Sequence, residues 1–208
     1  MAAASSSSRT KRKRDEEVDI LQKYTIDWNE KLGAGGFGNV FLAKDNATGK
    51  EVACKMVKID GTPGSMPRKQ VEREANILNK TLNYPSIIKV WDHCPGEPPD
   101  HGKYFIFMEL ASGGELFDHL GRNNNCLEEN EARRIFMSLV DGVAHCQLEG
   151  VAHLDLKFEN VMLTKEGAVK IVDFGLAHIY PQNADGSINR STKLQHGRGS
   201  RAYAARLK

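Results

Sequence analysis

The sequence lacks any hydrophobic run long enough to cross a membrane, and its first residues lack the apolar segment of a secretory signal. It also lacks a strong excess of one charge, because 29 basic residues nearly cancel 27 acidic ones and leave a net charge of +2. That balance does not indicate a generic nucleic-acid binder, so no specific nucleic-acid partner is expected. With 40% hydrophobic residues among 208, the chain can still bury a core, in one or two domains.

Cysteine is scarce, and its spacing argues against a zinc site. The four cysteines are Cys54, Cys94, Cys126 and Cys146, and none forms a C-x-x-C pair. Because no export signal is visible, we expect reduced thiols in a protein that is cytoplasmic and/or nuclear.

The first residues have a composition of their own. Residues 1–22 are predicted to form a disordered basic tail, since the first 14 are rich in Ala and Ser and cannot bury a core. The basic cluster from Arg9 to Arg14 precedes any acidic residue and is typical of a nuclear localisation signal. A solvated tail without a signal and a transit peptide are the alternatives.

Hydrophobic periodicity predicts a strand-rich front and a helical back. Pro67 precedes apolar residues at helical spacing, Val71, Ala75, Leu78 and Leu82, which indicate a helix over 68–82. Strands are expected over 40–44, 51–57, 86–91, 103–110, 160–163 and 169–174, and further helices over 114–120 and 127–148. The apolar stripe of the last helix is predicted to comprise Ala132, Ile135, Phe136, Leu139, Val143 and Ala144.

A glycine-rich loop is the first motif with a chemical meaning. Gly33, Gly35 and Gly38 form G-x-G-x-x-G, but an alternating strand follows, not the helix that a dinucleotide-binding fold requires. The loop also lacks the G-K-[ST] ending of a P-loop. A glycine hairpin beside Lys55 can hold phosphates, and Lys55 then needs a carboxylate, for which Glu74 is favoured over Glu72. An ordinary glycine turn is the alternative.

A dense polar stretch, HLDLKFEN, occupies residues 153–160, and DFG follows at 173–175. With GAGGFGNV, VACK and MELASGGELFDHL in the same order, five motifs over residues 25–205 resemble the eukaryotic protein kinase family. The resemblance implies an α+β, two-lobe fold, with a complete β-rich N-lobe over 23–110 and an incomplete helical C-lobe over 111–208 that carries the catalytic loop and the activation segment. A lysine at position 157 resembles the pattern of the serine/threonine branch, and ELASGGELFDHL is similar to the calcium/calmodulin-dependent kinases.

The resemblance also implies roles for single residues in transfer of the ATP γ-phosphate to Ser/Thr hydroxyls of proteins. Asp155 accepts the hydroxyl proton, Lys157 neutralises the γ-phosphate, and Lys55 with Glu74 holds the other phosphates. Asn160 and Asp173 bind Mg²⁺. The ATP-binding residues are expected to be Leu32, Gly33, Gly35, Gly36, Phe37, Gly38, Val40, Ala53, Lys55, Met108, Glu109, Leu110, Glu115 and Met162. Val40, Ala53 and Met162 would sandwich the adenine ring, or else pack as plain core.

Glu115 and Glu159 match positions that face substrate arginines in basophilic kinases, so a target with nearby basic residues is expected. Glu115 is alternatively placed at the ribose or in water.

Two departures from the family pattern stand out. Leu154 replaces an arginine that usually pairs with an activation-loop phosphate, and leucine cannot make such a charge-assisted bond. Regulation without that phosphate is therefore expected. The match to the A-P-E motif holds only to Ala205, so we expect a truncated chain of low stability. The alternative function is a catalytically weak or inactive ATP-binding regulatory module.

Overall fold

The computed structural model describes residues 20–35, 38–97, 100–191, 199–200 and 203. The predicted basic tail lies outside the described residues as far as residue 19. Contacts divide the chain into two units, the first reaching residue 75 and continuing over 90–110, the second formed by 76–89 and the chain from 111 onward. Residues 76–89, placed in the N-lobe from the sequence, thus make their contacts in the second unit.

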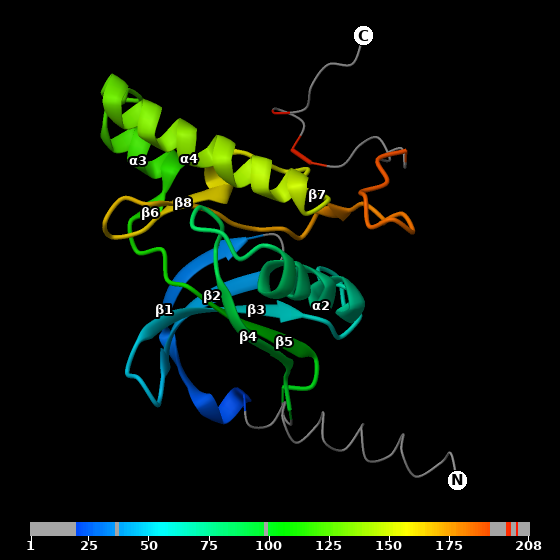
Figure 1. The fold of residues 1–208 in the computed structure, drawn as a ribbon. Coiled ribbons are helices and arrows are strands. Elements are labelled where there is room, and N and C mark those ends of the chain that lie inside the picture. Colours follow the sequence, from blue (N-terminus) through cyan, green and yellow to red (C-terminus); the bar gives the residue numbers. More distant parts are fainter. Residues whose placement is uncertain (1–19, 36–37, 98–99, 192–198, 201–202, 204–208) are drawn as a thin grey trace. The chain divides into compact units, whose positions relative to one another are not determined.

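The first unit is built on an antiparallel sheet in the order β1-β2-β3-β5-β4, with helix α2 drawn beside it in Figure 1. Its elements are β1 Tyr24–Gly35, β2 Gly38–Asp45, β3 Glu51–Lys58, α2 Arg68–Asn76, β4 Val90–Pro95 and β5 Lys103–Met108. The hairpin expected from the turn residues at 45–50 is present, since β2 pairs with β3 from Lys44–Glu51 to Asn39–Met56.

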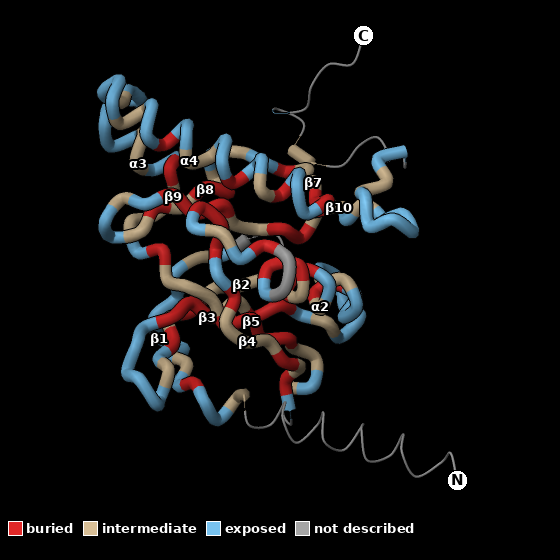
Figure 2. The backbone as a smooth tube through the Cα atoms, in the orientation of Figure 1, coloured by how far each residue is buried: buried red, intermediate tan, exposed pale blue. Residues whose placement is uncertain are grey.

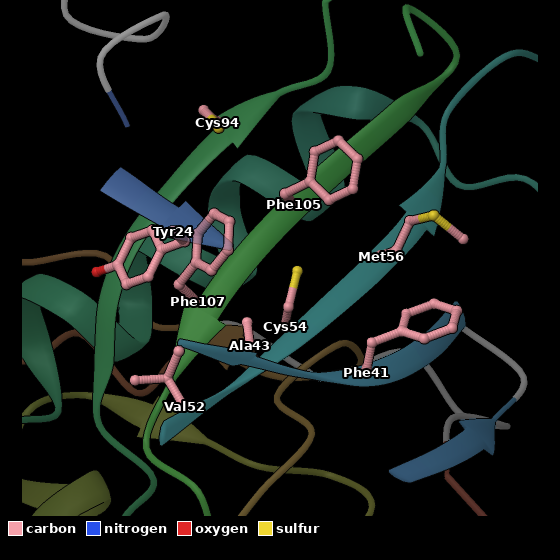
Figure 3. Packing of buried hydrophobic residues seen from close by; sticks show 9 residues of the cluster. All are labelled: Tyr24, Phe41, Ala43, Val52, Cys54, Met56, Cys94, Phe105 and Phe107. Carbon is pink, nitrogen blue, oxygen red and sulfur yellow. The ribbon is translucent and has the colours of Figure 1, made fainter. Parts of the chain in front are cut away.

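One face of this sheet carries an aromatic core, shown in Figure 3. The rings of Tyr24 and Phe107 stack with centroids 4.0 Å apart. Cys54 lies among them and is fully buried, and that burial raises the pKa of its thiol far above the usual range. Because side chains alternate along a strand, every second residue of β3 faces away from this core.

Helix α2 continues into a π-helical turn, η1, over Ile77–Thr81. The four apolar residues predicted at helical spacing, Val71, Ala75, Leu78 and Leu82, are all buried. The helix expected over 68–82 is therefore confirmed, with its last turn wound more loosely than an α-helix.

The second unit is mostly helical with short strand pairs. Its elements are β6 Gly114–Glu115, α3 Leu116–Arg122, α4 Glu129–Leu148, β7 Val151–Ala152, η2 Phe158–Asn160, β8 Val161–Leu163, β9 Val169–Ile171 and β10 His178–Ile179. β6, β8 and β9 form one small sheet, and β10 pairs with β7. No helix in the described part of the chain is long and apolar enough to span a membrane.

The strand expected over 86–91 is wrong in its position. β4 begins only at Val90, because the preceding backbone pairs elsewhere. The N–H of Ile171 donates to the carbonyl of Ser86 at 2.8 Å, and the N–H of Ile88 donates to the carbonyl of Ile171 at 3.0 Å. The backbone of Ser86 and Ile88 thus pairs with β9 of the second unit, whereas Val90 and Trp91 belong to β4 in the sheet of the first unit.

The apolar stripe predicted for α4 is wrong in part. Ile135 is buried, and the buried face continues through Gly142 and Cys146, at intervals of seven and four residues. Phe136 and Val143 are instead 64% and 40% exposed. Figure 2 shows long exposed stretches along this helix. Periodicity finds the helix, but it does not decide which of two apolar faces packs inward.

Loss of the Phe107 ring should destabilise the first unit strongly. Phe107 is fully buried, so Phe107→Ala removes a packed ring and is expected to cost about 3–5 kcal/mol of unfolding free energy. Leu32→Ala, at a position 43% exposed, should cost less than about 1 kcal/mol. Both tryptophans, Trp28 and Trp91, lie in this unit, so urea unfolding followed by tryptophan fluorescence measures it directly. Equal costs for the two variants would contradict this packing.

Candidate functional site

The glycine motif forms the tight connection between β1 and β2. Gly33 pairs with Val40, and Gly35 with Gly38, across the hairpin. Gly38 has a φ of +146°, and a Cβ there would collide with the backbone carbonyl of Met56 on β3. Only glycine therefore lets the loop run this close to the neighbouring strand. Gly36 and Phe37, at the tip, lie outside the described residues.

Four of the predicted nucleotide residues share the sheet face opposite the aromatic core. Val40 is paired in register with Lys55, and Ala53 with Met108. Their neighbours Phe41, Cys54 and Phe107 belong to the core, so alternation turns these four side chains to the other side. Ala53 is buried, whereas Val40 and Met108 are half-buried. Leu32 lies on β1, and Glu109 and Leu110 follow β5 at the end of the first unit.

An ion pair fixes the lysine of this face. The Nζ atom of Lys55 lies 2.7 Å from Oε1 of Glu74 on α2, and Glu74 is only 3% exposed. Glu72, the other candidate, pairs with Arg68 at 2.8 Å. The second carboxylate oxygen of Glu74 is buried with no hydrogen-bond partner in the described part of the chain. Such a buried pair holds the ammonium group in one place.

In the second unit, the residues after β7 form a loop organised around Asp155. Asp155 is buried, and its Oδ2 lies 3.2 Å from Nδ2 of Asn160. The same Nδ2 donates to the carbonyl of Asp155 at 2.7 Å, so two bonds join the residues across η2. Lys157 brings its Nζ to 3.4 Å from Oδ2. The sequence named all three residues, and the fold gathers them around one carboxylate.

His153 connects this loop to the segment that carries Asp173. Its Nε2 lies 2.9 Å from the carbonyl of Val172, which can only accept, so Nε2 carries the proton. Nδ1 is then free to accept the N–H of Asp155 at 3.2 Å. The ring also meets Phe174 edge-on, with centroids 4.5 Å apart. Sequence reasoning assigned His153 no role, although it opens the polar motif.

Ser200 is a second residue that the sequence analysis missed. Its backbone N–H donates to Oδ1 of Asp155 at 2.7 Å, and its hydroxyl accepts a bond from Nζ of Lys157 at 3.1 Å. Its position in GSRAY, residues 199–203, could have identified it, because this stretch is the start of the next motif that resembles the family. The end of the described activation segment therefore lies directly on the catalytic loop.

These contacts set the charge of Asp155. Burial of the carboxyl raises its pKa, but the hydrogen bonds from Ser200 and the charge of Lys157 outweigh burial and hold the pKa below its ordinary value. Asp155 is therefore ionised at neutral pH, with both oxygens oriented.

Asn160 and Asp173 offer the hard oxygen donors that Mg²⁺ prefers. Because Nδ2 of Asn160 is engaged by Asp155, its side-chain carbonyl oxygen is the end left to ligate a cation. The N–H of Val172 donates to the backbone carbonyl of Asn160 at 3.0 Å, which fixes the residue before Asp173. Asp173 itself has a φ of +61°. The amide and carboxylate oxygens of these two residues are of the chemical type that Mg²⁺ takes as ligands.

Acidic side chains gather where β6 meets β8. Glu115 is paired in register with Met162. Partial burial raises the pKa of Glu115, the charges of Asp118 and Glu159 raise it further, and Lys157 opposes them. Because the charges of Asp118 and Glu159 act on Glu115, both carboxylates lie near it, and the three form an acidic cluster beside the catalytic loop.

Leu154 occupies a strained backbone conformation. Its φ is +65°, in the left-handed region that costs a non-glycine residue about 1–3 kcal/mol. The residue is half-buried. The surrounding contacts must hold this conformation, because leucine itself contributes no local hydrogen bond that favours it.

Comparison with known proteins supports the same reading of the chain. A family model described as protein kinase domain matches residues 26–206. CBL-interacting serine/threonine-protein kinase 1 of Arabidopsis thaliana is 37% identical over 171 residues, which cover 82% of this chain and 36% of the relative. NUAK family SNF1-like kinase 1 of Mus musculus is 34% identical over 161 residues, covering 77% of this chain and 24% of the relative. The chain thus spans about a third or less of the length of these relatives.

The depressed pKa of Asp155 predicts a pH dependence of stability. The folded-state pKa lies below the unfolded value of about 3.9, so the carboxylate contributes stability that is present above that pH. This contribution is lost as the pH falls through the lower folded-state pKa. Asp155→Asn should therefore destabilise the chain at pH 6, and the difference from the wild type should shrink toward pH 3. Urea unfolding followed by far-UV circular dichroism measures it, and a difference that grows on acidification would contradict the assignment.

Proposed function

The chain belongs to the protein kinase domain family, and on that premise we propose that it transfers the γ-phosphate of ATP to Ser/Thr hydroxyls of proteins. The observation that carries the proposal is the environment of Asp155. An ionised carboxylate is held by Ser200 on one oxygen and by Asn160 and Lys157 on the other. A carboxylate that is ionised and oriented in this way can accept a hydrogen bond from an attacking hydroxyl and position it.

Asp155 orients the substrate hydroxyl and takes up its proton as the oxygen attacks phosphorus. Lys157 lies within reach of the same carboxylate and places a positive charge where the transferred phosphoryl group gains negative charge. Its bond to the hydroxyl of Ser200 limits the positions of the ammonium group. Asp155 and Lys157 thereby supply the charge pattern of phosphoryl transfer without forming a covalent intermediate.

Lys55 binds the phosphates that stay with the nucleotide. Its ammonium group is held by Glu74, so it meets an incoming triphosphate already oriented. The backbone of the glycine hairpin at Gly33, Gly35 and Gly38 lies on the neighbouring strands of the same sheet and can approach phosphate oxygens closely.

The adenine ring is assigned to the sheet face that carries Val40, Ala53 and Met108. Their apolar side chains suit a flat ring, and the backbone of Glu109 and Leu110 supplies polar groups at its edge. Met162, which the family resemblance also assigns to this ring, lies on β8 of the second unit.

Asn160 and Asp173 would hold Mg²⁺. When bound, the ion neutralises charge on the phosphate oxygens and so lowers the barrier to transfer. Asn160 is suited to this role because its amide nitrogen is already committed to Asp155.

The acidic cluster of Glu115, Asp118 and Glu159 favours substrates with basic residues near the target hydroxyl. It lies close enough to Lys157 for that charge to influence Glu115. Carboxylates crowded together are stabilised by an arriving guanidinium, which pairs with two oxygens at once.

Phosphate transfer to a serine peptide tests the proposed activity. The whole chain with Mg²⁺ and ATP should phosphorylate the peptide, and Asp155→Asn should lower kcat by about 100-fold to 10,000-fold because the proton acceptor is lost. Asp141→Asn, at an exposed position of α4, is the matched control and should leave kcat unchanged. The ³²P incorporated per minute measures the rate. Equal rates for the wild type and Asp155→Asn would rule out this mechanism.

Substrate charge tests the acidic cluster. A peptide with arginines beside its serine should have a lower KM than the same peptide with alanines. The double change Glu115→Gln and Glu159→Gln should raise the KM of the arginine peptide roughly tenfold, because charge-assisted hydrogen bonds are lost. Glu166→Gln, in the exposed turn before β9, should have no effect. If the two peptides show equal KM values with the wild type, the cluster does not select the substrate.

A further inference from the structure

Residues 181–190 of the activation segment make contacts that do not involve the proposed catalytic residues. Residues 181–190 form a hairpin in which Gln182 bridges to Ile188. The N–H of Asn189 donates to the carbonyl of Pro181 at 2.8 Å, which closes the base of the hairpin. The hairpin therefore has its own hydrogen bonds and presents defined side chains to its surroundings.

This hairpin docks on residues 147–150, which form the end of α4 and the turn that leads to β7. Ile188 packs over Gly150 so closely that a Cβ at Gly150 would lie 2.8 Å from Cδ1 of Ile188. The Nη2 atom of Arg190 donates to the carbonyl of Gln147 at 3.0 Å. The N–H of Tyr180 donates to the carbonyl of Gly150 at 2.8 Å. The carbonyl of Gln147 also accepts the N–H of Gly150 at 3.2 Å, so Arg190 adds a side-chain donor to a carbonyl at the end of α4.

The same turn leads straight into the catalytic loop. β7, Val151–Ala152, follows this turn and leads directly to His153. Asp155 lies two positions after His153. Leu154, between them, has the strained φ of +65°. A strained residue persists only where contacts on both sides over-determine the backbone. Gly199 packs against the carbonyl oxygen of Leu154 itself. The residues that precede Leu154 are held by the pairing of β7 with β10 and by the contact of Gly150 with Ile188 of the hairpin.

We propose that the hairpin of residues 181–190 positions the catalytic loop, with Arg190 and Ile188 as the positioning residues that hold the α4–β7 turn. Leu154 cannot pair with a phosphate, so the fold needs an anchor for the activation segment that works without one. A guanidinium on a backbone carbonyl and a packed isoleucine form such an anchor. The inference deepens the proposed function, on which its effect on activity rests, whereas its effect on the backbone is independent of catalysis.

Hydrogen–deuterium exchange of the whole chain without nucleotide tests the anchor. Arg190→Met keeps most of the side-chain length and removes the donor, so the amides of 150–155 should exchange about three- to tenfold faster, the factor expected for one lost hydrogen bond. Arg190→Lys retains a donor and should restore exchange near the wild-type rate. Arg133→Met, which removes an exposed pair with Glu129 on the same helix, is the control and should leave these amides unchanged.

Activity gives the second measurement. Arg190→Met should lower kcat by a similar factor with the KM for ATP unchanged, because the loop and not the nucleotide face is disturbed. Arg190→Lys should recover kcat. Ile188→Val is a milder change and should speed exchange in the same amides by a smaller factor, which keeps the test valid if Arg190→Met does not fold.

The outcomes separate the two proposals. Unchanged exchange over 150–155 in both Arg190→Met and Ile188→Val would overturn the positioning role, whatever the activity. Faster exchange with no phosphate transfer by any variant, the wild type included, would support the positioning role and contradict the proposed function.

Discussion

The hydrogen-bonded carboxylate of Asp155 is the constraint on which the second unit is organised. Four residues contact Asp155, at its side chain or backbone: His153, Lys157 and Asn160 lie within five positions of it, and Ser200 lies 45 positions further along the chain. Each contact fixes an oxygen or the backbone, and burial, which raises the pKa of Asp155, is outweighed by the hydrogen bonds from Ser200 and the charge of Lys157. A buried charge is costly unless it is paired and bonded, so this site can exist only if the loop and the end of the activation segment fold together.

In the first unit, the buried ion pair of Lys55 with Glu74 has a comparable role. The sheet turns an aromatic core to one side and a sparse apolar face to the other, and Lys55 lies on that second face with Glu74 as its partner. The ion pair is almost completely buried, which ties α2 to β3 and determines where the ammonium group can act. In each unit, then, the core supplies rigidity and a single charged pair or cluster supplies the chemistry.

Much of this arrangement could be predicted from the sequence where the signal is local. The strand after the glycine motif excluded a dinucleotide-binding fold, and the spacing of Val71, Ala75 and Leu78 correctly predicted the helix formed by α2 and η1. Residues two positions apart on a helix point in different directions, and Glu74, not Glu72, lies on the buried face with Val71 and Ala75 and pairs with Lys55.

Features that depend on contacts between residues far apart in the chain could not be predicted from the sequence. Ser86 and Ile88 read as part of one strand, yet their backbone pairs with Ile171, far along the chain. Phe136 and Val143 fit a helical stripe as well as Ile135 does, and only the neighbours of α4 decide which side is buried. Ser200 acts mainly through its backbone N–H, which leaves no trace in a pattern of side chains.

The central claim is that Lys55, held in place by Glu74, binds the phosphates of ATP. An experimental structure of the chain with Mg²⁺ and a non-hydrolysable ATP analogue tests it most directly. The account predicts that Nζ of Lys55 contacts the α- and β-phosphates while it keeps its ion pair with Glu74. A nucleotide bound with its phosphates away from Lys55 would contradict the account.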